Sequence, residues 1–278
     1  MTGSPAHKKQ RADELLVSRG LAVDVHEASA FIMANRVRSG SDESLIVDKP
    51  GMQLPEDAPL SIKGVKRYVG RGGLKLEGAL DQFGIDPTGL RCIDLGASTG
   101  GFTDCLLQRG ARSVCAVDVG YGQLSHRLQV DPRVQVRDRT NIRTSDPSDL
   151  GAPFDLVVAD LSFVGIAALA QQIAALPSEE GQCVLLIKPQ FESAREDIGC
   201  GGVVKDYALH FTALEKAIES LRVAGLETSQ VAPSPIRGAA GNVEFFVLCG
   251  LRETMPEDQE GMIRAALNQV HHHATIDA

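Results

Sequence analysis

From residue 73 onward, short apolar runs alternate with amphipathic segments, and this alternation restricts the possible folds more than any other feature of the chain. Apolar strands that alternate with helices build a mostly parallel, doubly wound sheet with helices on both faces. The last two apolar runs have no long helix between them, so we expect an antiparallel pair at one edge. The seven predicted strands cover 91–95, 113–118, 134–138, 154–159, 182–187, 227–232 and 243–249, and the accompanying helices cover 73–83, 101–109, 123–130, 164–176 and 207–224.

The N-terminal part follows another pattern, that of a small α/β unit. A helix over 11–19 ends at Gly20, and a second helix begins after Asp24, a residue type that caps helix starts. Asn35 ends this second helix, because asparagine tolerates the left-handed conformation. Short strands are predicted near 36–38, 44–47 and 60–63. We therefore divide the chain into a small domain (8–63), a linker (64–70), a large α/β domain (71–252) and a C-terminal helix with a loose tail (253–278).

Composition excludes several classes of protein. Apolar residues make up 43% of the 278 residues and charged residues 23%, as in ordinary folded soluble proteins. No apolar run reaches 18 residues and none follows the N-terminal lysines, so we expect neither a membrane span nor a secretion signal. The six cysteines form no C-x-x-C pair, so we expect free thiols in the cytoplasm and no metal site. His271–His273 is interpreted as a solvated tail.

Charge is unevenly distributed along the chain, whose net charge is −8. Residues 1–80 carry 12 lysines and arginines against 10 acids, whereas residues 81–278 carry 16 against 26. A local basic surface on an acidic body favours a polyanionic partner bound at one place. A merely solvated surface is the alternative interpretation. The basic residues that cluster without an intervening acid are Lys63, Lys66, Arg67, Arg71 and Lys75.

A glycine-rich turn follows the first predicted strand of the large domain, with the spacing Gly-x-x-x-Gly-Gly from Gly96. This spacing matches neither the dinucleotide fingerprint nor a phosphate-binding Walker loop. Asp94, just before the turn, suits a cationic ligand that bears an amino acid, such as S-adenosylmethionine. Asp118 ends the second strand, where a carboxylate can hold ribose hydroxyls, and Asp138 ends the third, where it can accept from an adenine amine. The alternative is that these acids are ordinary strand-end caps.

Four charged residues form a candidate catalytic set: Lys75, Asp160, Lys188 and Glu244. Asp160 and Lys188 end neighbouring strands, Glu244 begins the last strand, and Lys75 lies on the helix before the first. Taken singly, each is more typical of a solvated surface. Together they can place two ammonium groups and two carboxylates near one spot, where burial and mutual screening would tune Lys188.

The motifs that carry these residues resemble one family as a set. They are Arg71-Gly-Gly-x-Lys75-Leu76, Asp94-x-Gly-Ala-Ser-Thr-Gly-Gly-Phe-Thr103, Asp118-Val-Gly-Tyr-Gly-Gln-Leu124, Asp160-Leu-Ser-Phe163, Lys188-Pro-Gln-Phe-Glu192 and Gly241-Asn-Val-Glu244-Phe. They are similar to the motifs of the TlyA family, S-adenosylmethionine-dependent 2′-O-methyltransferases of ribosomal RNA, often named hemolysin A. The resemblance covers residues 8–250 and implies a Rossmann-like methyltransferase domain of the FtsJ type preceded by an S4-type RNA-binding domain.

The resemblance also implies roles for individual residues. Lys75, Asp160, Lys188 and Glu244 would be the catalytic tetrad, acting on a ribose that is most often a cytidine's, in the RNA of a ribosomal subunit. Cofactor contacts fall on Asp94, Gly96, Ala97, Ser98, Thr99, Gly100, Gly101, Phe102, Asp118, Val119, Asp138 and Asp160. Phosphate contacts to RNA fall on Arg11, Arg19, Arg36, Arg38, Lys49 and Arg71.

The small domain departs from the family pattern in two places. Asp24-Val25 replaces a serine followed by a basic residue, and the hairpin Val37-Arg38-Ser39-Gly40-Ser41-Asp42 lacks its second apolar position. The tetrad and cofactor motifs show no departure.

Two other functions compete with this interpretation. A lytic membrane protein needs an amphipathic helix with a basic face, and the predicted helix 164–176 has no basic residue. A non-catalytic RNA-binding protein on a methyltransferase scaffold would not need all four tetrad residues.

Overall fold

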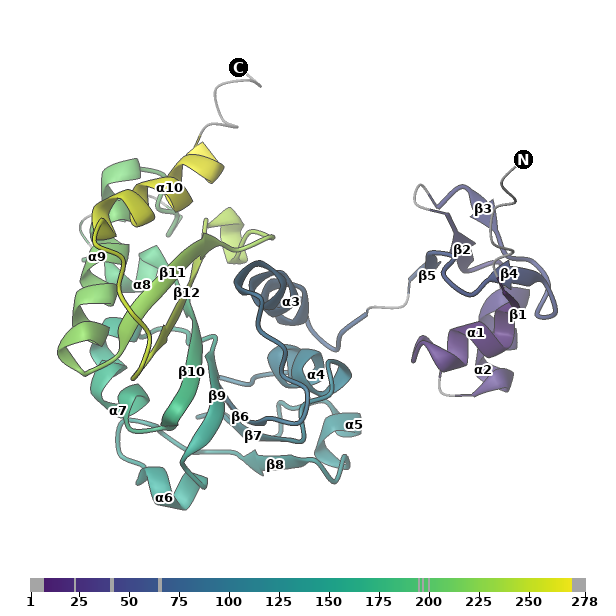
Figure 1. The fold of residues 1–278 in the computed structure, drawn as a ribbon, viewed down its shortest axis with the longest axis horizontal. Helices are drawn as coiled ribbons and strands as arrows, with labels where there is room; N and C mark the ends of the chain where they lie inside the picture. The colour runs from purple at the N-terminus through teal and green to yellow at the C-terminus, as the bar shows by residue number, and fades with distance from the viewer. Residues whose placement is uncertain are drawn as a thin grey trace, which may run out of the picture. The chain divides into compact units, whose positions relative to one another are not determined.

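The computed structural model describes residues 8–22, 24–40, 43–64, 67–194, 196, 198–199 and 201–271. The chain forms two compact units, residues 1–67 and 68–278 (Figure 1). Tyr68 is buried in the core of the second unit, so this unit begins within the segment that we predicted as a linker. Ser41, Asp42, Lys66, His272 and His273 lie outside the described residues.

The first unit packs two helices, α1 (Ala12–Ser18) and α2 (Val25–Met33), against short strands. Leu16 and Ile32 are fully buried between them. The strands form a three-stranded sheet in the order β3-β2-β5 and a two-stranded sheet of β1 and β4. Their bounds are β1 Lys9–Arg11, β2 Val37–Ser39, β3 Leu45–Ile46, β4 Gln53–Pro55 and β5 Leu60–Ile62. The strands β1 and β4 were not predicted, because β1 has no apolar residue and β4 has a single leucine next to a proline.

The helix ends of this unit follow local rules. Gly20 and Asn35 both adopt the left-handed conformation, at φ of 66° and 53°, which ends each helix. The Asp24 carboxylate accepts a hydrogen bond of 2.8 Å from the backbone N–H of Glu27, as a capping residue does. The predicted ends of both helices are confirmed.

The second unit is a seven-stranded sheet in the order β11-β12-β10-β9-β6-β7-β8. Only β12 runs antiparallel to its neighbours β10 and β11, and all other neighbouring pairs are parallel. The predicted doubly wound sheet with an antiparallel edge pair is confirmed. The strands are β6 Arg91–Leu95, β7 Ser113–Val117, β8 Val134–Arg137, β9 Phe154–Ala159, β10 Pro177–Ile187, β11 Glu227–Pro233 and β12 Phe245–Gly250.

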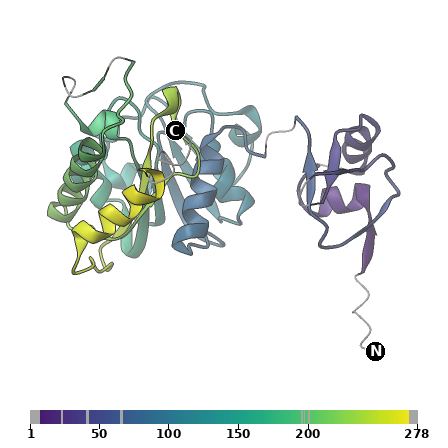
Figure 2. The same cartoon turned by 90° about the horizontal axis from the view of Figure 1, so that it is seen from above.

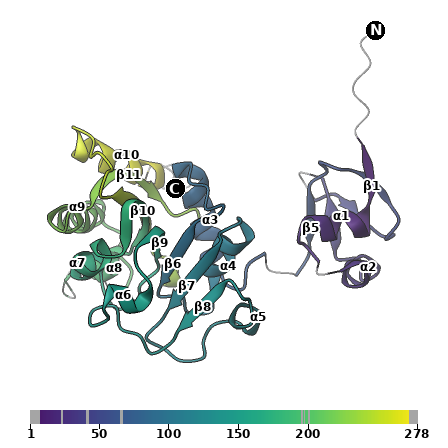
Figure 3. The same ribbon diagram turned by 60° about the horizontal axis from the view of Figure 1, so that its bottom comes forward.

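Helices cover both faces of this sheet (Figures 1 and 3). One face packs against α3 (Gly72–Phe83), α4 (Gly101–Gln108) and α5 (His126–Gln129). The other packs against α7 (Ala170–Ala174) and α9 (Tyr207–Val223), and α10 lies beside α9 (Figure 2). The remaining short helices are α6 Pro147–Leu150 and α8 Pro189–Glu192, and α10 spans Gln259–His271.

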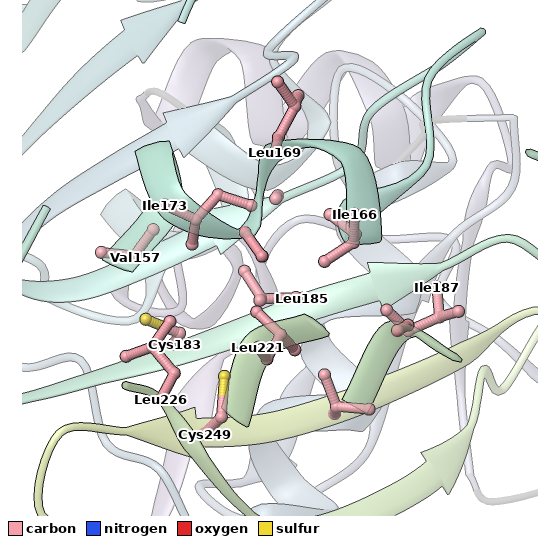
Figure 4. Packing of buried hydrophobic residues seen from close by; sticks show 14 of the residues in the cluster. Val157, Ile166, Leu169, Ile173, Cys183, Leu185, Ile187, Leu221, Leu226 and Cys249 are labelled. Carbon is pink, nitrogen blue, oxygen red and sulfur yellow. The ribbon is translucent and has the colours of Figure 1, made fainter. Parts of the chain in front are cut away.

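Figure 4 shows the core between the sheet and the second helical layer. Side chains of Val157 on β9 and Leu185 on β10 face Ile173 of α7 and Leu221 of α9, and all four are fully buried. Such a core fixes the strands in register, and with them the residues at the strand ends. In the described part of the chain, no helix has the length and apolar character needed to cross a membrane.

Two predicted helices differ from the structure. The helix predicted over 123–130 is reduced to four residues, because the chain has a left-handed residue at Gly122, with a φ of 66°, and a non-helical ψ of 137° at Ser125. The helix predicted over 164–176 divides into a 3₁₀ turn, η1 (Ile166–Leu169), and α7, because Leu169 leaves helical geometry at φ −123°. Both changes lie at the carboxyl edge of the sheet.

Candidate active site

One cavity of about 660 Å³ opens at the carboxyl ends of the central strands, within the size range of small-molecule sites. It lies entirely in the second unit. All four candidate catalytic residues line it, and so do most of the predicted cofactor residues: Gly96, Ala97, Ser98, Thr99, Gly101, Phe102, Asp118 and Val119. The sheet therefore brings together residues that lie more than 160 positions apart in the sequence, as Lys75 and Glu244 do.

The tetrad is arranged as two lysine–carboxylate pairs. Nζ of Lys188 lies 2.6 Å from Oδ1 of Asp160, and Nζ of Lys75 lies 2.5 Å from Oε2 of Glu244. The lysine side chains are 9% and 10% exposed, and the Glu244 carboxylate is 2% exposed. Pairing of this kind is needed because an isolated charge would be costly at such depth.

Lys188 has a richer environment than Lys75. It follows the last residue of β10 and precedes α8, so its backbone is fixed by a buried strand. Its ammonium donates a hydrogen bond of 3.2 Å to Oγ of Ser162 and lies 5.7 Å from the ring centre of Phe191. Ser162 and Phe191 also line the cavity, so the ammonium group is held at its wall.

Glu244 is held from the other side by the segment before β12. A side chain at Gly238 would overlap the Glu244 carboxylate, so the position accepts only glycine without displacing it. The Lys75 side chain comes from α3, which lies 169 residues before Glu244 in the sequence. Its position depends on how α3 packs against α4.

The glycine-rich turn lies directly against the tetrad. Gly96 has a φ of 83°, and a Cβ there would come within 2.7 Å of the Asp160 carbonyl oxygen. The backbone N–H groups of Ser98 and Gly120 each donate a hydrogen bond of 2.7 Å to the Asp118 carboxylate. The turn after β6 and the loop after β7 are thereby tied together at the cavity.

Asp94 does not line the cavity, although we predicted it as a cofactor contact. It is fully buried beneath the turn, where Oδ2 accepts hydrogen bonds from the backbone N–H (2.9 Å) and Oγ1 (2.6 Å) of Thr103. Its Oδ1 has no hydrogen-bond partner in the part of the chain that the structure describes. Burial raises the pKa of Asp94 to about 7, and the neighbouring Asp160 and Asp118 add to this effect.

Gly100 and Asp138 also fall outside the cavity lining. Gly100 is packed against Leu124 and Leu128, where a side chain would overlap both. The Asp138 carboxylate accepts a 2.9 Å hydrogen bond from the backbone N–H of Gly122 and so holds the neighbouring loop. The segment after β8 reaches the cavity through Thr140, Asn141 and Ile142 instead.

Several lining residues were not predicted individually. Phe163 is 92% exposed, at a φ of 67°, and its ring lies 5.9 Å from that of Phe191. Both aromatic residues lie three positions after a tetrad residue, within a quoted motif, and this was the available signal. Other unpredicted lining residues that belong to the quoted motifs are Gln123, Leu161, Ser162 and Gln190, whereas Gly70, Val164 and Leu169 lie outside them.

The arginines predicted to hold phosphates are engaged within the first unit. Arg11 pairs with Asp13 at 2.6 Å, and Arg19 donates to the carbonyl oxygens of Ala58 and Glu56. Arg36 and Arg38 likewise donate to backbone carbonyls, those of Lys63, Asn35 and Val37, whereas Lys49 is exposed. Arg71 belongs to the second unit, where it lines the cavity and donates to the carbonyl of Arg237.

Comparison with known proteins agrees with this geometry. Residues 68–251 match the model of the FtsJ-like methyltransferases. The chain belongs to this family. A Bacillus subtilis protein provisionally named as an rRNA methyltransferase, YqxC, is 43% identical over 243 residues, 86% of this chain and 85% of that protein.

Further relatives cover most of the chain. The 16S/23S rRNA (cytidine-2′-O)-methyltransferase TlyA of Mycobacterium tuberculosis is 41% identical over 242 residues, 86% of this chain and 89% of that protein. The solved structure of a Streptococcus thermophilus protein provisionally named a hemolysin superposes with a TM-score of 0.72 at 35% identity, covering 98% of this chain and 99% of that one. The present chain is thus an enzyme of the methyltransferase class.

Proposed function

We propose that this methyltransferase transfers a methyl group from S-adenosylmethionine to the ribose 2′-hydroxyl of a nucleotide in ribosomal RNA, a cytidine as in its named relatives. The observation that carries the proposal is the pair of buried lysine–carboxylate contacts at one cavity beside a glycine-rich turn. A ribose hydroxyl is a weak acid and needs positive charge at its oxygen when it acts as a nucleophile, and this arrangement supplies it.

The residues present fit S-adenosylmethionine. The absence of side chains lets Gly96 pack against the Asp160 backbone and Gly101 against the start of α3, so that the turn forms the wall of the cavity. Asp118 offers a carboxylate to ribose hydroxyls. Asp94 lies beneath the turn, and one of its buried carboxylate oxygens has no hydrogen-bond partner among the residues that the structure describes. A cationic ligand above the turn would favour the ionised form of this carboxyl. When bound, the cofactor supplies an electrophilic methyl group on a sulfonium. Asp138 and Gly100 hold the loops around this site in place and do not form part of the cavity surface.

The chain's own residues would promote the reaction by position and charge. Lys188 holds and stabilises the oxygen that becomes an alkoxide, and Asp160 together with Ser162 orients its ammonium group. Lys75, fixed by Glu244, adds positive potential on the other side. The hydroxyl proton would pass to the Asp160 carboxylate beside Lys188, and general-base assistance of this kind contributes about 10²–10⁴-fold to a rate. Stabilisation of the developing charge by Lys188 and alignment of the reacting atoms contribute further.

Aromatic and basic groups at the cavity rim suit an RNA strand. The exposed Phe163 ring can stack on an unpaired base next to Lys188. The guanidinium of Arg139, which precedes the lining residue Thr140, lies 4.3 Å from the ring centre of Tyr121, which is 71% exposed. We assign the first unit as an S4-type RNA-binding domain, whose exposed Lys49 would contact phosphates.

The test is transfer of labelled methyl groups from S-adenosylmethionine to ribosomal RNA or ribosomal subunits, followed by mass spectrometry of nuclease digests. We expect label in a 2′-O-methylated nucleotide, and labelling that is about 10²–10³-fold slower with the Lys188→Ala variant. Label on a base, or transfer to protein only, would contradict the proposal. A liposome-leakage assay on the same protein separates it from a lytic function, for which leakage without methyl transfer would be the signature.

A further inference from the structure

Glu192 is a buried acid outside the tetrad. It is the last residue of α8, four positions after Lys188, and it is 3% exposed. A glutamate so deeply buried is rare unless its carboxylate is bound by a specific partner. Burial raises the pKa of Glu192, which means that keeping its carboxylate ionised at this depth costs free energy.

The partner of the Glu192 carboxylate is the beginning of η1. Its Oε1 accepts a hydrogen bond of 2.6 Å from the backbone N–H of Ile166, the first residue of η1, and the N–H of Ala167 also interacts with the carboxylate. The preceding residue, Gly165, lies so close that a Cβ there would overlap the carboxylate. The carboxylate therefore fits a site shaped by the backbone of Gly165–Ala167.

This contact joins the two loops that carry the Lys188–Asp160 pair. Asp160, Ser162 and Phe163 lie between the end of β9 and η1, so the anchored Ile166 limits where this loop can go. Lys188 and Glu192 lie on one short segment after β10, which is tied at its far end because Nζ of Lys216 on α9 donates a 2.7 Å hydrogen bond to the Glu192 carbonyl. One side chain thus links the segments that follow β9 and β10.

We infer that Glu192 is a positioning residue, which sets the loop of Asp160 and Ser162 against Lys188 and so aligns the reactive ammonium. This inference rests on the proposed function. Glu192 itself is not among the residues that line the cavity, so it would act through the residues that do. A purely structural role would be to stabilise the domain without changing the reaction, and the two roles predict different measurements.

The experiment compares Glu192→Ala and Glu192→Gln with a matched control, Glu215→Gln, an exposed acid of α9. Methyl transfer, cofactor Kd and thermal midpoint are measured on the full chain. A misplacement of about 1 Å costs a rate about 10²-fold, so we expect a kcat loss of that order for Glu192→Ala with a cofactor Kd within about twofold of wild type. Glu192→Gln keeps an oxygen acceptor for the Ile166 N–H, and we expect it to recover about tenfold of the lost rate.

The decisive measurement repeats Glu192→Ala in the Lys188→Ala background. If Glu192 acts through Lys188, its removal has little further effect on the residual rate there, because residues that act as a unit are non-additive. Equal fold-losses in both backgrounds would overturn the inference. An unchanged kcat in both Glu192 variants, with wild type active, would also overturn it.

A second readout does not depend on turnover. We expect the amide hydrogens of Ile166 and Ala167 to exchange faster in Glu192→Ala than in wild type, with little change in strand β9. Uniformly faster exchange throughout the domain would indicate a structural role and overturn the inference. A wild-type protein that transfers no methyl group to ribosomal RNA would instead refute the proposed function, whatever the exchange data show.

Discussion

Charged side chains at the carboxyl edge of the large sheet pair with opposite charges in the interior, whereas the arginines of the first unit bind their partners at its surface. The Lys75 and Lys188 side chains are 10% and 9% exposed, and each contacts a carboxylate. In the first unit, Arg11 is 47% exposed where it pairs with Asp13, and Arg19 and Arg36 form exposed hydrogen bonds to backbone carbonyl groups. Burial fixes the charges of a reaction site, while an exposed arginine is free to exchange its partner for a phosphate.

The largest expected effect concerns Lys188. Its replacement by alanine removes the charge nearest the reacting oxygen, so the methyl-transfer rate should fall by about 10²–10³-fold. The cofactor Kd, measured by calorimetry, should stay within about twofold, because the glycine-rich turn is intact. Lys205→Ala, at an exposed position, is the control and should be unchanged. A Lys188 variant with wild-type turnover would show that its pairing with Asp160 is only structural.

The second expected effect concerns the stability of the buried pairs. Glu244→Ala leaves the Lys75 ammonium buried without its partner, and breaking such a pair costs about 3–5 kcal/mol of unfolding free energy. Asp160→Ala leaves the Lys188 ammonium equally buried but still bonded to Ser162, so it should cost less. Denaturant unfolding of both variants measures the difference. Equal losses would mean that Ser162 does not compensate for the loss of Asp160.

A third prediction concerns pH and Asp94. Its pKa is raised by burial to about 7 from an ordinary value near 4, so folding favours the protonated form. Its contribution to stability is therefore largest at acid pH and is lost as the pH rises from about 4 to about 7, by up to roughly 1.4 kcal/mol per pH unit. Asp94→Asn should flatten this part of the stability profile.

The comparison between wild type and Asp94→Asn isolates this group. His210 titrates in the opposite sense, because burial lowers its pKa to about 4, but it is present in both proteins and cancels. Asp86→Asn is the control, since hydrogen bonds from Thr88 lower the pKa of this exposed carboxyl and move its effect to more acid pH. Parallel wild-type and Asp94→Asn profiles between pH 5 and 7 would show that Asp94 is ionised in the folded state.

The smallest expected effects lie in the first unit. Lys49→Ala should weaken RNA binding and reduce the slope of log affinity against log salt by about one, as loss of one phosphate contact does. Arg19→Ala should instead lower the stability by about 1 kcal/mol, because its guanidinium bonds two carbonyl groups of the same unit. Filter binding at several salt concentrations and thermal unfolding measure these effects. If Arg19→Ala weakened RNA binding and Lys49→Ala lowered the stability instead, Arg19 would be the phosphate contact and Lys49 the structural residue.

How far each region could be predicted follows from the same physical difference. A buried parallel strand fixes the residue at its end, so Asp118, Asp160 and Lys188 could be placed at one edge from the sequence, and the structure confirms that all three line one cavity. The depth of Asp94 could not be predicted, because it depends on how the turn folds over it. The partners of Arg19 and Arg36 are set by loops of the first unit that have no periodic pattern.

Irregular segments limited the prediction in the same way within the second unit. The sequence 164–176 has an apolar pattern typical of one helix, and nothing in it indicates that a carboxylate from α8 binds the backbone at Ile166. Phe163 and Glu192 belong to motifs that were noticed, yet their exposure and burial depend on the tertiary structure. Pattern therefore predicts elements, and packing decides what lies between them.

The balanced composition of the tetrad has a consequence for how substrate is recruited. Two ammonium groups and two carboxylates in contact cancel at a distance, so the reaction centre exerts almost no pull on an approaching polyanion. Attraction must come from unpaired cations elsewhere on the surface, which salt screens readily. Ionic strength should accordingly change the rate of substrate association, while the rate of methyl transfer in the bound complex stays nearly constant.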